Sequence, residues 1–325
     1  MVNKVLDILK DSKSFISGED IAKKLNISRA GVWKNIEKLR NMGYVITSVT
    51  NKGYLLTEDK LIFNQIEIEK EIKTALLGKK VYFFEEITST NDYAKDMANN
   101  IQEEGTIVIA NNQTKGRGRL ERAWISDKGG IFLSLILKPN IQLFNIMQIT
   151  LLASISICDA IKKLTLLDAK IKWPNDIIIN NKKVGGILTE VIAQVEKIST
   201  VILGIGINVN NEKFSLDLQK KATSIFLENN KTVSKASLIG CFLEEFEKKY
   251  LIYKEKEDFN LFLEEYKKLC LNIGKEVKVI HNKKEMLGKV IDISNIGEII
   301  LKTNNNEIKI ISGEVLLKNI NGEYI

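Results

Sequence analysis

One short segment of the sequence concentrates positive charge between glycines. Residues 113–124 read Gln-Thr-Lys-Gly-Arg-Gly-Arg-Leu-Glu-Arg-Ala-Trp, with Glu121 as the single acid. The basic residues of the segment are Lys115, Arg117, Arg119 and Arg122. Arginine can hold a phosphate through two parallel hydrogen bonds, and Gly116 and Gly118 let the backbone approach a ligand closely. The segment is predicted to be a mobile loop that binds a polyphosphate or an adenylate, although such a loop could equally meet RNA.

A second polar cluster, Lys172-Trp-Pro-Asn-Asp176, falls between two predicted strands. Pro174 fixes a turn there, and Lys172 can neutralise a phosphate. Asn175 and Asp176 carry oxygen atoms of the kind that Mg²⁺ prefers. Taken alone, this pentapeptide is better explained by an ordinary turn with a packed tryptophan.

A third cluster, Lys182-Lys-Val-Gly-Gly-Ile-Leu-Thr-Glu190, begins a strand directly after the turn Asn180-Asn181. Gly185 and Gly186 have no side chains, so a flat ligand could lie against the strand. Lys183 would then point at a carboxylate or an acyl phosphate. The alternative is a hairpin that contains a bulge.

Two further motifs lie at the ends of predicted elements. Gly204-Ile-Gly-Ile-Asn208 ends an apolar strand, but it is not a dinucleotide fingerprint because Val209 stands where the third glycine would be. Asn208 is placed to join a metal or phosphate site. Thr88-Ser-Thr-Asn91 precedes a helix, where Ser89 or Thr90 either caps the helix or helps to bind a polar ligand group.

The rarity of two residue types excludes several chemistries. His281 is the single histidine, which excludes a zinc site built on several histidines. A Ser-His-Asp triad could use only His281 as its base. The cysteines Cys158, Cys241 and Cys270 form no Cys-x-x-Cys pair and are expected to be buried thiols. The chemistry must therefore use Lys, Arg, Asn, Asp and backbone groups.

Composition is that of a globular protein, with 44% hydrophobic and 27% charged residues among 325. No run of about 18 apolar residues is present, so no membrane span is expected. The N-terminus reads as an amphipathic helix and not as a signal peptide, which predicts a cytoplasmic location. The net charge of +7 is compatible with a polyanionic partner.

The first 62 residues predict a winged helix-turn-helix domain. Apolar spacing indicates a helix over residues 2–10, and Ser17-Gly-Glu-Asp opens a second helix. Ser28 is the predicted N-cap of a third helix that runs from Arg29 to about Met42. Two β-rich runs, 44–47 and 53–56, then predict a hairpin.

This order of elements places several polar or large side chains where DNA would lie. Those predicted to contact DNA are Ser28, Arg29, Trp33, Lys34 and Lys38 on the third helix, and Lys52 at the tip of the wing. From a major groove such side chains reach base edges and phosphates. The alternative is a small helical domain that contacts another protein.

The remainder predicts an α+β architecture with a mixed sheet, in residues 63–272, followed by a small barrel in residues 273–325. The predicted strands of the sheet are 81–84, 106–110, 131–138, 170–173, 176–179, 184–191 and 200–209. The predicted helices are 90–99, 147–163, 235–253 and 259–269. Five short strands, 276–280, 286–293, 298–301, 307–311 and 314–317, suggest an SH3-like barrel at the end of the chain.

Taken together and in this order, the motifs are highly specific. Nearly the whole chain resembles the bifunctional biotin–protein ligases, which are also repressors of biotin genes. The resemblance implies that the central domain is similar to class II synthetases. One position departs from the family pattern: Glu121 stands where the family usually has glycine, which puts the closure of the loop in question.

The resemblance implies a two-step reaction. Biotin and MgATP give biotinyl-5′-AMP and pyrophosphate, and a lysine of biotin carboxyl carrier protein then takes the biotinyl group and releases AMP. The implied biotin-binding residues are Ser89, Thr90, Asn91, Gln113, Arg117, Gly118, Arg119, Lys183, Gly185, Gly186 and Gly204. The implied ATP-binding residues are Lys172, Asn175, Asp176, Asn208 and Trp124. Arg117, Arg119 and Lys183 are expected to be catalytic, and Asn175, Asp176 and Asn208 to hold Mg²⁺.

The resemblance also implies partners. Biotinyl-5′-AMP would act as corepressor, and a homodimer formed on ligand or DNA binding would present two recognition helices to an operator. Two other functions stay open at this point. A lipoate–protein ligase shares the central fold, and a ligand-responsive transcription regulator could carry an inactive enzyme domain.

Overall fold

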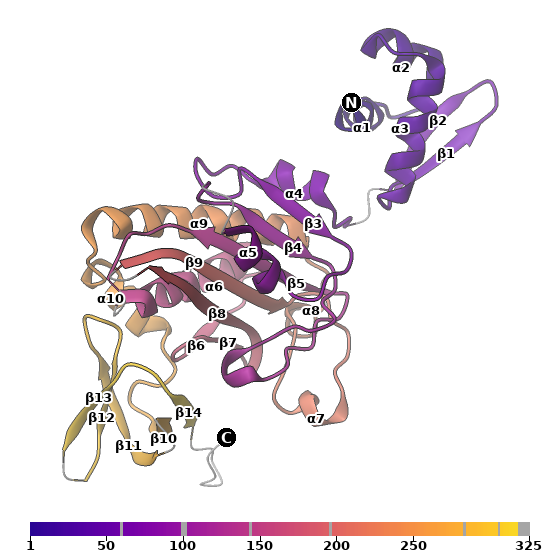
Figure 1. The fold of residues 1–325 in the computed structure, drawn as a ribbon. Coiled ribbons are helices and arrows are strands. Elements are labelled where there is room, and N and C mark those ends of the chain that lie inside the picture. Colours follow the sequence, from indigo (N-terminus) through magenta and orange to yellow (C-terminus); the bar gives the residue numbers. More distant parts are fainter. Residues whose placement is uncertain are drawn as a thin grey trace. The chain divides into compact units, whose positions relative to one another are not determined.

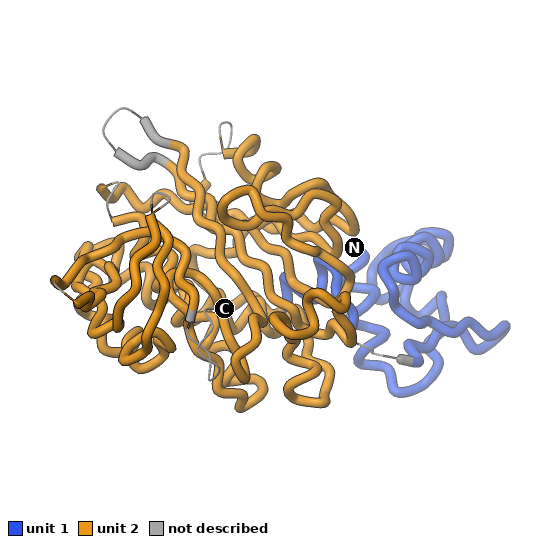
Figure 2. The backbone as a smooth tube through the Cα atoms, turned by 90° about the horizontal axis from the view of Figure 1, so that it is seen from below, with its two compact units in different colours: residues 1–70 blue, residues 71–325 orange. Residues whose placement is uncertain are grey.

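A computed structural model describes residues 1–58, 61–98, 103–142, 145–194, 197–281, 284–304 and 306–317. The chain forms two compact units, Met1–Lys70 and Glu71–Ile325 (Figure 2). They are called the first and the second unit below. Among the helices of the described residues, none has both the length and the apolar character that crossing a bilayer requires.

The first unit has the predicted order of helices and hairpin. Its elements are α1 (Val2–Asp11), α2 (Gly18–Leu25), α3 (Arg29–Asn41), β1 (Val45–Val49) and β2 (Gly53–Glu58). Ser17 Oγ accepts a hydrogen bond from the Asp20 N–H at 3.0 Å, and Ser28 Oγ accepts one from the Gly31 N–H at 3.0 Å. The predicted N-cap Ser28 is thereby confirmed, and Ser17 caps the second helix in the same way, because each hydroxyl satisfies a backbone donor that the helix leaves unpaired.

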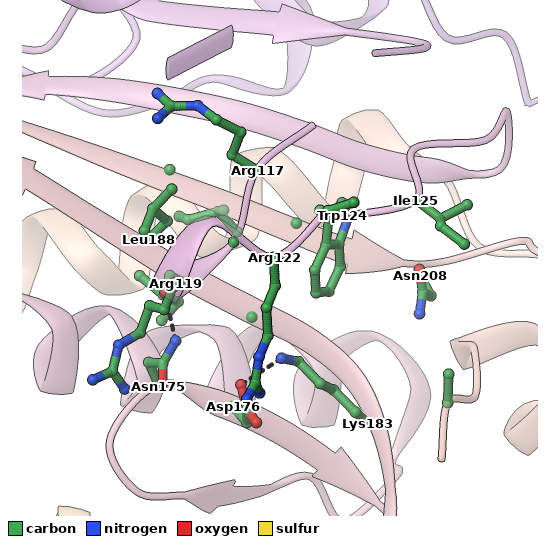
Figure 3. Close-up of a pocket in the computed structure, with 18 of the residues that line it drawn as sticks. Arg117, Arg119, Arg122, Trp124, Ile125, Asn175, Asp176, Lys183, Leu188 and Asn208 are labelled. Carbon is green, nitrogen blue, oxygen red and sulfur yellow. Dashed lines mark hydrogen bonds and ion pairs between the residues drawn. The ribbon is translucent and has the colours of Figure 1, made fainter. Parts of the chain in front are cut away.

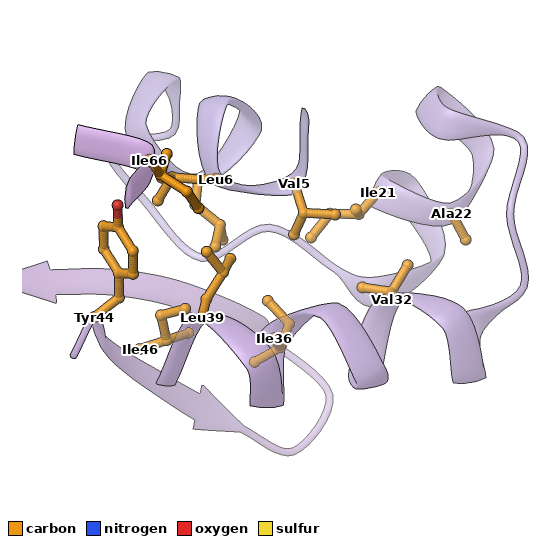
Figure 4. Close-up of a cluster of buried hydrophobic side chains, with 11 residues drawn as sticks. Val5, Leu6, Ile21, Ala22, Val32, Ile36, Leu39, Tyr44, Ile46 and Ile66 are labelled. Atoms are coloured by element: carbon orange, nitrogen blue, oxygen red, sulfur yellow. The ribbon is translucent and has the colours of Figure 1, made fainter. Parts of the chain in front are cut away.

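The core of the first unit joins the three helices to the hairpin and to the next helix, α4 (Gln65–Glu71). Val5, Leu6, Val32 and Ile36 are fully buried in it, and Ile66 of α4 packs against them (Figure 4). Because Ile66 packs in this core, the first unit extends to Lys70. The sequence had placed the end of the domain at residue 62.

The second unit is built on a seven-stranded sheet of order β3-β4-β5-β9-β8-β7-β6 (Figure 1). The strands are β3 (Val81–Phe84), β4 (Ile107–Ala110), β5 (Gly130–Leu137), β6 (Lys170–Lys172), β7 (Asp176–Ile179), β8 (Lys182–Gln194) and β9 (Lys197–Asn208). β3 and β4 pair parallel, and every other neighbouring pair is antiparallel. The predicted mixed sheet is therefore confirmed.

Helices cover both faces of this sheet. On one face, Ala94 of α5 (Thr90–Ala98) packs with Val108, Ile136 and Ile202 of the strands. On the other face, Leu238 and Phe242 of α9 (Lys235–Lys256) line a small cavity together with strand residues Leu133 and Ile205. The remaining helices are α6 (Ile146–Thr165), the short α7 (Leu216–Gln219) and α8 (Ile225–Asn229), and α10 (Asn260–Leu269). Asn99, predicted as the last residue of the α5 helix, lies outside the described residues.

The last part of the second unit is a five-stranded antiparallel sheet, called the C-terminal sheet below. Its order is β13-β12-β11-β10-β14, so β14 is an edge strand. The strands are β10 (Glu276–His281), β11 (Lys284–Ile293), β12 (Ile299–Lys302), β13 (Glu307–Ile310) and β14 (Glu314–Leu317). All five predicted strands form, while residues 318–325 lie outside the described residues. The division of the second unit at residue 272 stays a prediction.

Three contacts fix the C-terminal sheet and the segment before it to the rest of the second unit. Trp173, with an exposed fraction of 1%, donates from Nε1 to the Gly297 carbonyl at 2.9 Å. Its backbone N–H donates to Asn272 Oδ1 at 2.7 Å. Lys267 of α10 pairs with Asp292 of β11 at 2.8 Å. Trp173 thus ties the β11–β12 connection and the segment before β10 to the turn that holds Asn175 and Asp176.

We expect Trp173→Phe to lower the free energy of unfolding of the second unit by about 2 kcal/mol. The change removes a buried hydrogen bond, leaves the Gly297 carbonyl unpaired and opens a small void. Urea denaturation followed by circular dichroism measures the effect. The matched control is Trp33→Phe at a side chain that is 58% exposed, where a change within about 0.5 kcal/mol is expected. Equal effects of the two substitutions would contradict the anchoring role.

Candidate active site

One face of the central strands is bare of large side chains next to α5. Successive residues of a strand point to opposite faces, and on β9 the cavity-facing residues are Gly204, Gly206 and Asn208. Leu188 and Gly186 of the neighbouring β8 line the same cavity. The alternation of glycine with apolar residues in these strands therefore places a depression on one face of the sheet and a packed core on the other.

A bulge in β8 determines which residues face this depression. The pairing of β7 with β8 shifts at this point, from Ile177 opposite Gly185 to Ile178 opposite Lys183. Lys183 and Gly186 therefore share the cavity face, although their odd spacing would put them on opposite faces of a regular strand. A Cβ on Gly186 would lie 3.2 Å from Lys183 Nζ.

The same bulge corrects the prediction for Gly185. A Cβ there would meet the Gly206 carbonyl at 3.0 Å, with Ile207 and Ile177 next to it. Gly185 therefore faces the neighbouring strands and is not among the cavity-lining residues. The sequence anticipated a bulge only as an alternative, and without it the phase of the strand was wrong at this position.

The depression is the floor of a cavity of about 650 Å³. All the other residues predicted to bind biotin or ATP line it: Ser89, Thr90, Asn91, Gln113, Arg117, Gly118, Arg119, Trp124, Lys172, Asn175, Asp176, Lys183, Gly186, Gly204 and Asn208. Basic side chains outnumber acidic ones among its lining residues. The tertiary structure thus brings five separate sequence motifs to one cavity.

One end of the cavity is a network of neutral polar groups. Gln113 Oε1 accepts hydrogen bonds from the Thr90 N–H at 2.8 Å and from the Thr90 hydroxyl at 3.1 Å. The buried Ser134 hydroxyl contacts Asn91 Oδ1 at 2.5 Å and Thr90 Oγ1 at 2.8 Å. Gly204 leaves the space that Asn91 occupies, because a Cβ there would overlap the Asn91 amide. These contacts fix a wall of donors and acceptors suited to a neutral polar ring.

Arg117 lines the cavity, and its guanidinium is paired with protein carboxylates. Its guanidinium pairs with Asp92 of α5 and lies 3.6 Å from Glu190 of β8. Figure 3 shows the side chain directed away from Asp176 and Lys183. Glu190 in turn pairs with Lys95 at 2.5 Å and accepts from Asn91 Nδ2 at 2.7 Å. Arg117 therefore anchors the loop to α5 and β8, and its charge is already balanced by protein carboxylates.

The opposite end of the cavity is cationic. Lys183 pairs with Asp176 at 2.6 Å, and Arg119 donates to Asn175 Oδ1 at 3.0 Å (Figure 3). Burial lowers the pKa of Lys172 and that of Arg119 from their usual values, while the nearby Asp176 opposes the shift in both. Desolvated cations of this kind are stabilised by an incoming anion. This end is suited to phosphates.

Trp124 lies between the two ends. A Cβ on Gly206 would be 2.7 Å from its indole, and a Cβ on Gly186 would be 3.2 Å from it. Lys183 Nζ is 5.2 Å from the ring centroid. Trp124 Nε1 is buried without a hydrogen-bond partner in the described part of the chain. The two glycines therefore make room for a tryptophan ring, which forms an apolar wall above the strands.

The residues predicted to hold Mg²⁺ fit it unequally. The Asn175 amide already has two partners, since Oδ1 accepts from Arg119 and Nδ2 donates to the Ile187 carbonyl at 2.7 Å. Asp176 offers a carboxylate, and the Asn208 amide donates to the Thr223 carbonyl at 3.1 Å, which leaves its Oδ1 for another partner. The described residues contain no cluster of three acidic, His or Cys side chains. The site fits an ion held mainly by substrate phosphates and water.

Glu121 belongs to a strained turn at the tip of the loop. Leu120 and Glu121 have φ angles of 56° and 59°, in the left-handed region, within the short helix η1 (Arg119–Glu121). Each such residue costs about 1–2 kcal/mol unless it is glycine. A glycine at position 121 would therefore suit this turn better than the glutamate that stands there.

Sequence reasoning missed two segments of the cavity wall. One includes Lys213, Phe214 and Lys221 around α7, and the other is 313–315 at the start of β14. The first is attached through the backbone of Lys183, whose N–H donates to the Lys221 carbonyl at 2.8 Å. No sequence motif marks either segment, because only long-range pairing brings them to the cavity.

A second candidate site lies on the first unit. All the residues predicted to contact DNA are exposed: Ser28, Arg29, Trp33, Lys34, Lys38 and Lys52. Arg40 is instead held within the fold, since it donates to the Ile46 carbonyl at 2.7 Å and pairs with Glu37 at 2.6 Å. The exposed face of α3 is thus basic and open to a large partner.

Three family models match the chain. An HTH domain matches residues 2–55, the biotin/lipoate A/B protein ligase family matches residues 83–208, and the biotin protein ligase C-terminal domain matches residues 273–318. These matches follow the winged helix, the cavity-bearing sheet and the C-terminal sheet.

Curated relatives match over nearly the whole length. The bifunctional ligase/repressor BirA of Bacillus subtilis (strain 168) is 38% identical over 93% of this chain and 94% of its own. The protein of the same name from Escherichia coli (strain K12) is 28% identical over 94% of this chain and 93% of its own. A solved biotin protein ligase from Aquifex aeolicus, in complex with biotin and ATP, is 30% identical with a TM-score of 0.66, over 74% of this chain and 98% of that chain.

The matches therefore agree in length, in order and in fold with the expectation from the motifs. A relative of 38% identity that spans 93% of the chain carries both the ligase and the repressor in its name. This chain belongs to the biotin–protein ligase family, in the group of bifunctional ligases and repressors.

Proposed function

We propose that the cavity of the second unit makes biotinyl-5′-AMP from biotin and ATP and transfers the biotinyl group to a carrier protein. In the first step a biotin carboxylate oxygen attacks the α-phosphorus, and pyrophosphate leaves. In the second step the amine of a lysine on biotin carboxyl carrier protein attacks the acyl carbon, and AMP leaves. Neither step requires a histidine, in keeping with the single His281.

The two ends of the cavity support a definite orientation of the substrates. The neutral network of Thr90, Asn91 and Gln113 suits the ureido ring of biotin, and the apolar wall of Trp124 and Leu188 suits its fused rings and chain. The carboxylate would then reach Lys183 on the cavity face of the bulged strand. ATP would lie over Lys172 and Asn208, and the Aquifex relative was solved with biotin and ATP together.

Lys183 carries the proposed chemistry. Its ammonium group is held at 2.6 Å by Asp176, so it is oriented before any substrate arrives. As the carboxylate attacks, negative charge grows on the α-phosphate oxygens, and a fixed cation stabilises that charge without reorganisation. Catalysis then rests on positioning and on charge stabilisation.

The loop arginines divide their roles in this proposal. Arg117 secures the base of the loop through Asp92 and Glu190, so its part in catalysis is positional. Arg119 faces Asn175 and is placed to fold over the acyl phosphate. Mg²⁺ held by the phosphates, with Asp176 and Asn208 nearby, would add further charge neutralisation.

The single observation that carries the ligase function is the meeting of a neutral polar wall and a cationic end in one cavity. An inactive enzyme domain would not need Lys183, Arg119 and Lys172 to converge with their charges retained. The C-terminal family model is that of biotin protein ligases, and the Aquifex relative is a biotin protein ligase with biotin bound, which disfavours the lipoate–protein ligase alternative.

We expect Lys183→Gln to reduce the rate of biotinyl-5′-AMP formation by about 100-fold or more, which is the loss usually found when one oriented charge-stabilising group is removed. Biotin-dependent exchange of labelled pyrophosphate into ATP measures this step without the carrier protein. The effect should fall mainly on kcat, since the charge develops during the reaction.

The matched control is Lys182→Gln, the neighbouring lysine, which does not line the cavity. It should exchange pyrophosphate at a rate within about twofold of the unchanged protein. Normal exchange in the Lys183→Gln variant would contradict the proposed role of Lys183.

We also propose that the first unit binds operator DNA and that biotinyl-5′-AMP acts as corepressor by favouring a homodimer. The exposed face of α3 supplies the contacts to one half-site, and a dimer would present two such helices to a palindromic operator. A cytoplasmic location follows, since the reaction needs ATP and the repressor needs genomic DNA.

We expect Lys34→Ala together with Lys38→Ala to weaken DNA binding about tenfold and to reduce the salt slope of binding by about one to two, since each neutralised phosphate releases condensed counterions. Fluorescence anisotropy on a duplex selected from a random pool by the unchanged protein measures both quantities. Biotin plus ATP should tighten binding and give two chains per duplex.

Lys4→Ala, at an exposed lysine of α1, is the control and should change neither quantity. Equal DNA affinity with and without biotin plus ATP would contradict the corepressor role. An unchanged salt slope in the double variant would contradict the proposed DNA-binding face.

A further inference from the structure

The tip of the 113–124 loop is held in place by the C-terminal sheet. Arg122 donates from both terminal nitrogens to Glu314 of β14, at 2.8 and 2.7 Å, in a bidentate pair. Arg119 Nη2 donates to the carbonyl of the preceding residue, Gly313, at 3.3 Å. The two arginines that flank the left-handed residues Leu120 and Glu121 therefore both contact the start of β14.

The two residues between these arginines disfavour the backbone conformation that they adopt. Leu120 and Glu121 are both left-handed, and neither is a glycine. The side chain of Leu120 is 70% exposed, so burial of that side chain does not stabilise the turn. Within the turn, the Gly118 N–H donates to the Arg122 carbonyl at 2.7 Å. Contacts from outside the loop are therefore required to offset the strain.

The acceptor of the pair is firmly held. The C-terminal sheet is fixed to the rest of the second unit by Trp173 through Gly297 and by Lys267 of α10 through Asp292. Glu314 is itself partly covered, with a side-chain exposure of 26%. A rigid acceptor favours a directional, bidentate interaction over a mobile surface pair.

The position of the Glu314 carboxylate on the wall of this cavity requires an explanation, because the cavity is lined with cations. Glu314 lines the same cavity as Lys172, Lys183 and Arg119, where a free carboxylate would repel an incoming phosphate. Its hydrogen bonds from Arg122 hold the pKa of Glu314 below its usual value, so it stays ionised and paired. Removing the acid would favour the anionic ligand electrostatically, so its presence points to a role in holding the loop.

We propose that Glu314 is a positioning residue: through Arg122 it holds the strained tip closed, so that Arg119 stays over the cavity and the acyl-adenylate is retained. We call this contact the Arg122–Glu314 clamp. The retention of an adenylate rests on the proposed ligase function, but the closure of the loop does not. Opening of the clamp exposes the mixed anhydride to water and to bystander amines, with no change in the atoms that react.

Closure is tested first on the ligand-free protein, by limited trypsin digestion followed by mass spectrometry of the cuts after Lys115, Arg117 and Arg119. Glu314→Gln keeps the shape of the side chain and removes its charge. We expect cleavage in the loop to become about two- to fivefold faster, the range expected for loss of a partly exposed ion pair. The control Glu307→Gln, on β13 of the same sheet, should leave the rate unchanged.

Two further variants make this result specific to the clamp. The exchange Arg122→Glu with Glu314→Arg restores an ion pair and should bring the rate of cleavage after Arg119 back toward that of the unchanged protein. Glu121→Gly relieves the left-handed strain and should slow cleavage in the Glu314→Gln background. Equal cleavage in Glu314→Gln and the unchanged protein would overturn the proposal, as would a failure of the exchange to restore protection while the thermal midpoint is kept.

The consequence for the adenylate is measured separately. With biotin and ATP, Glu314→Gln should label the lysines of a bystander protein such as serum albumin two- to fivefold faster relative to its own rate of pyrophosphate exchange. Faster cleavage without faster labelling would overturn the retention role. If the unchanged protein formed no adenylate, the ligase proposal would be rejected. The trypsin digestion of the ligand-free protein would still test the Arg122–Glu314 clamp.

Discussion

The bulge in β8 is the constraint on which the rest of the site depends. Because one extra residue is inserted opposite β7, Lys183 and Gly186 point to the same face of the sheet. In a regular strand the lysine would point away from the cavity that Gly186, Gly204 and Gly206 open. The bulge therefore puts a fixed cation beside a space wide enough for the Trp124 ring, and it also sets Lys183 within reach of Asp176.

Some cations of the cavity are paired with protein carboxylates, and others are placed to bind an anion. Arg117 has two carboxylates beside it, Asp92 and Glu190, and it secures the base of the loop. Lys172 and Arg119 are partly desolvated, with Asp176 as their nearby acid. This difference separates positions that hold the protein together from positions that can hold phosphate, although the sequence shows the same basic residue types in both.

Much of the molecule could be anticipated from local patterns. The N-caps Ser17 and Ser28, the strands with their period of two, and the five short strands at the end of the chain all follow from interactions between near neighbours in sequence. The short helices α7 and α8 were missed, since helices of this length carry too few residues for a periodic signal. The ion pairs of Arg117 could not be anticipated, because its partners lie 25 and 73 positions away.

By itself, the sequence determined the residue types and the order of motifs, and with them the family: a helix-turn-helix, a basic glycine-rich loop, two lysine clusters and a terminal set of strands. Only the tertiary structure decided which of these side chains face the cavity. In the folded chain Gly185 faces the neighbouring strands, and Arg117 pairs with Asp92 and lies close to Glu190. Gly313 and Glu314 contact the loop although they lie nearly 200 positions away in the sequence. The physical reason is that strand phase, burial and long-range ion pairs depend on neighbours in space, while a motif records only neighbours in sequence. Glu121 illustrates both contributions. The sequence identified it as a departure from the family pattern, and the structure places it in a left-handed turn that favours glycine.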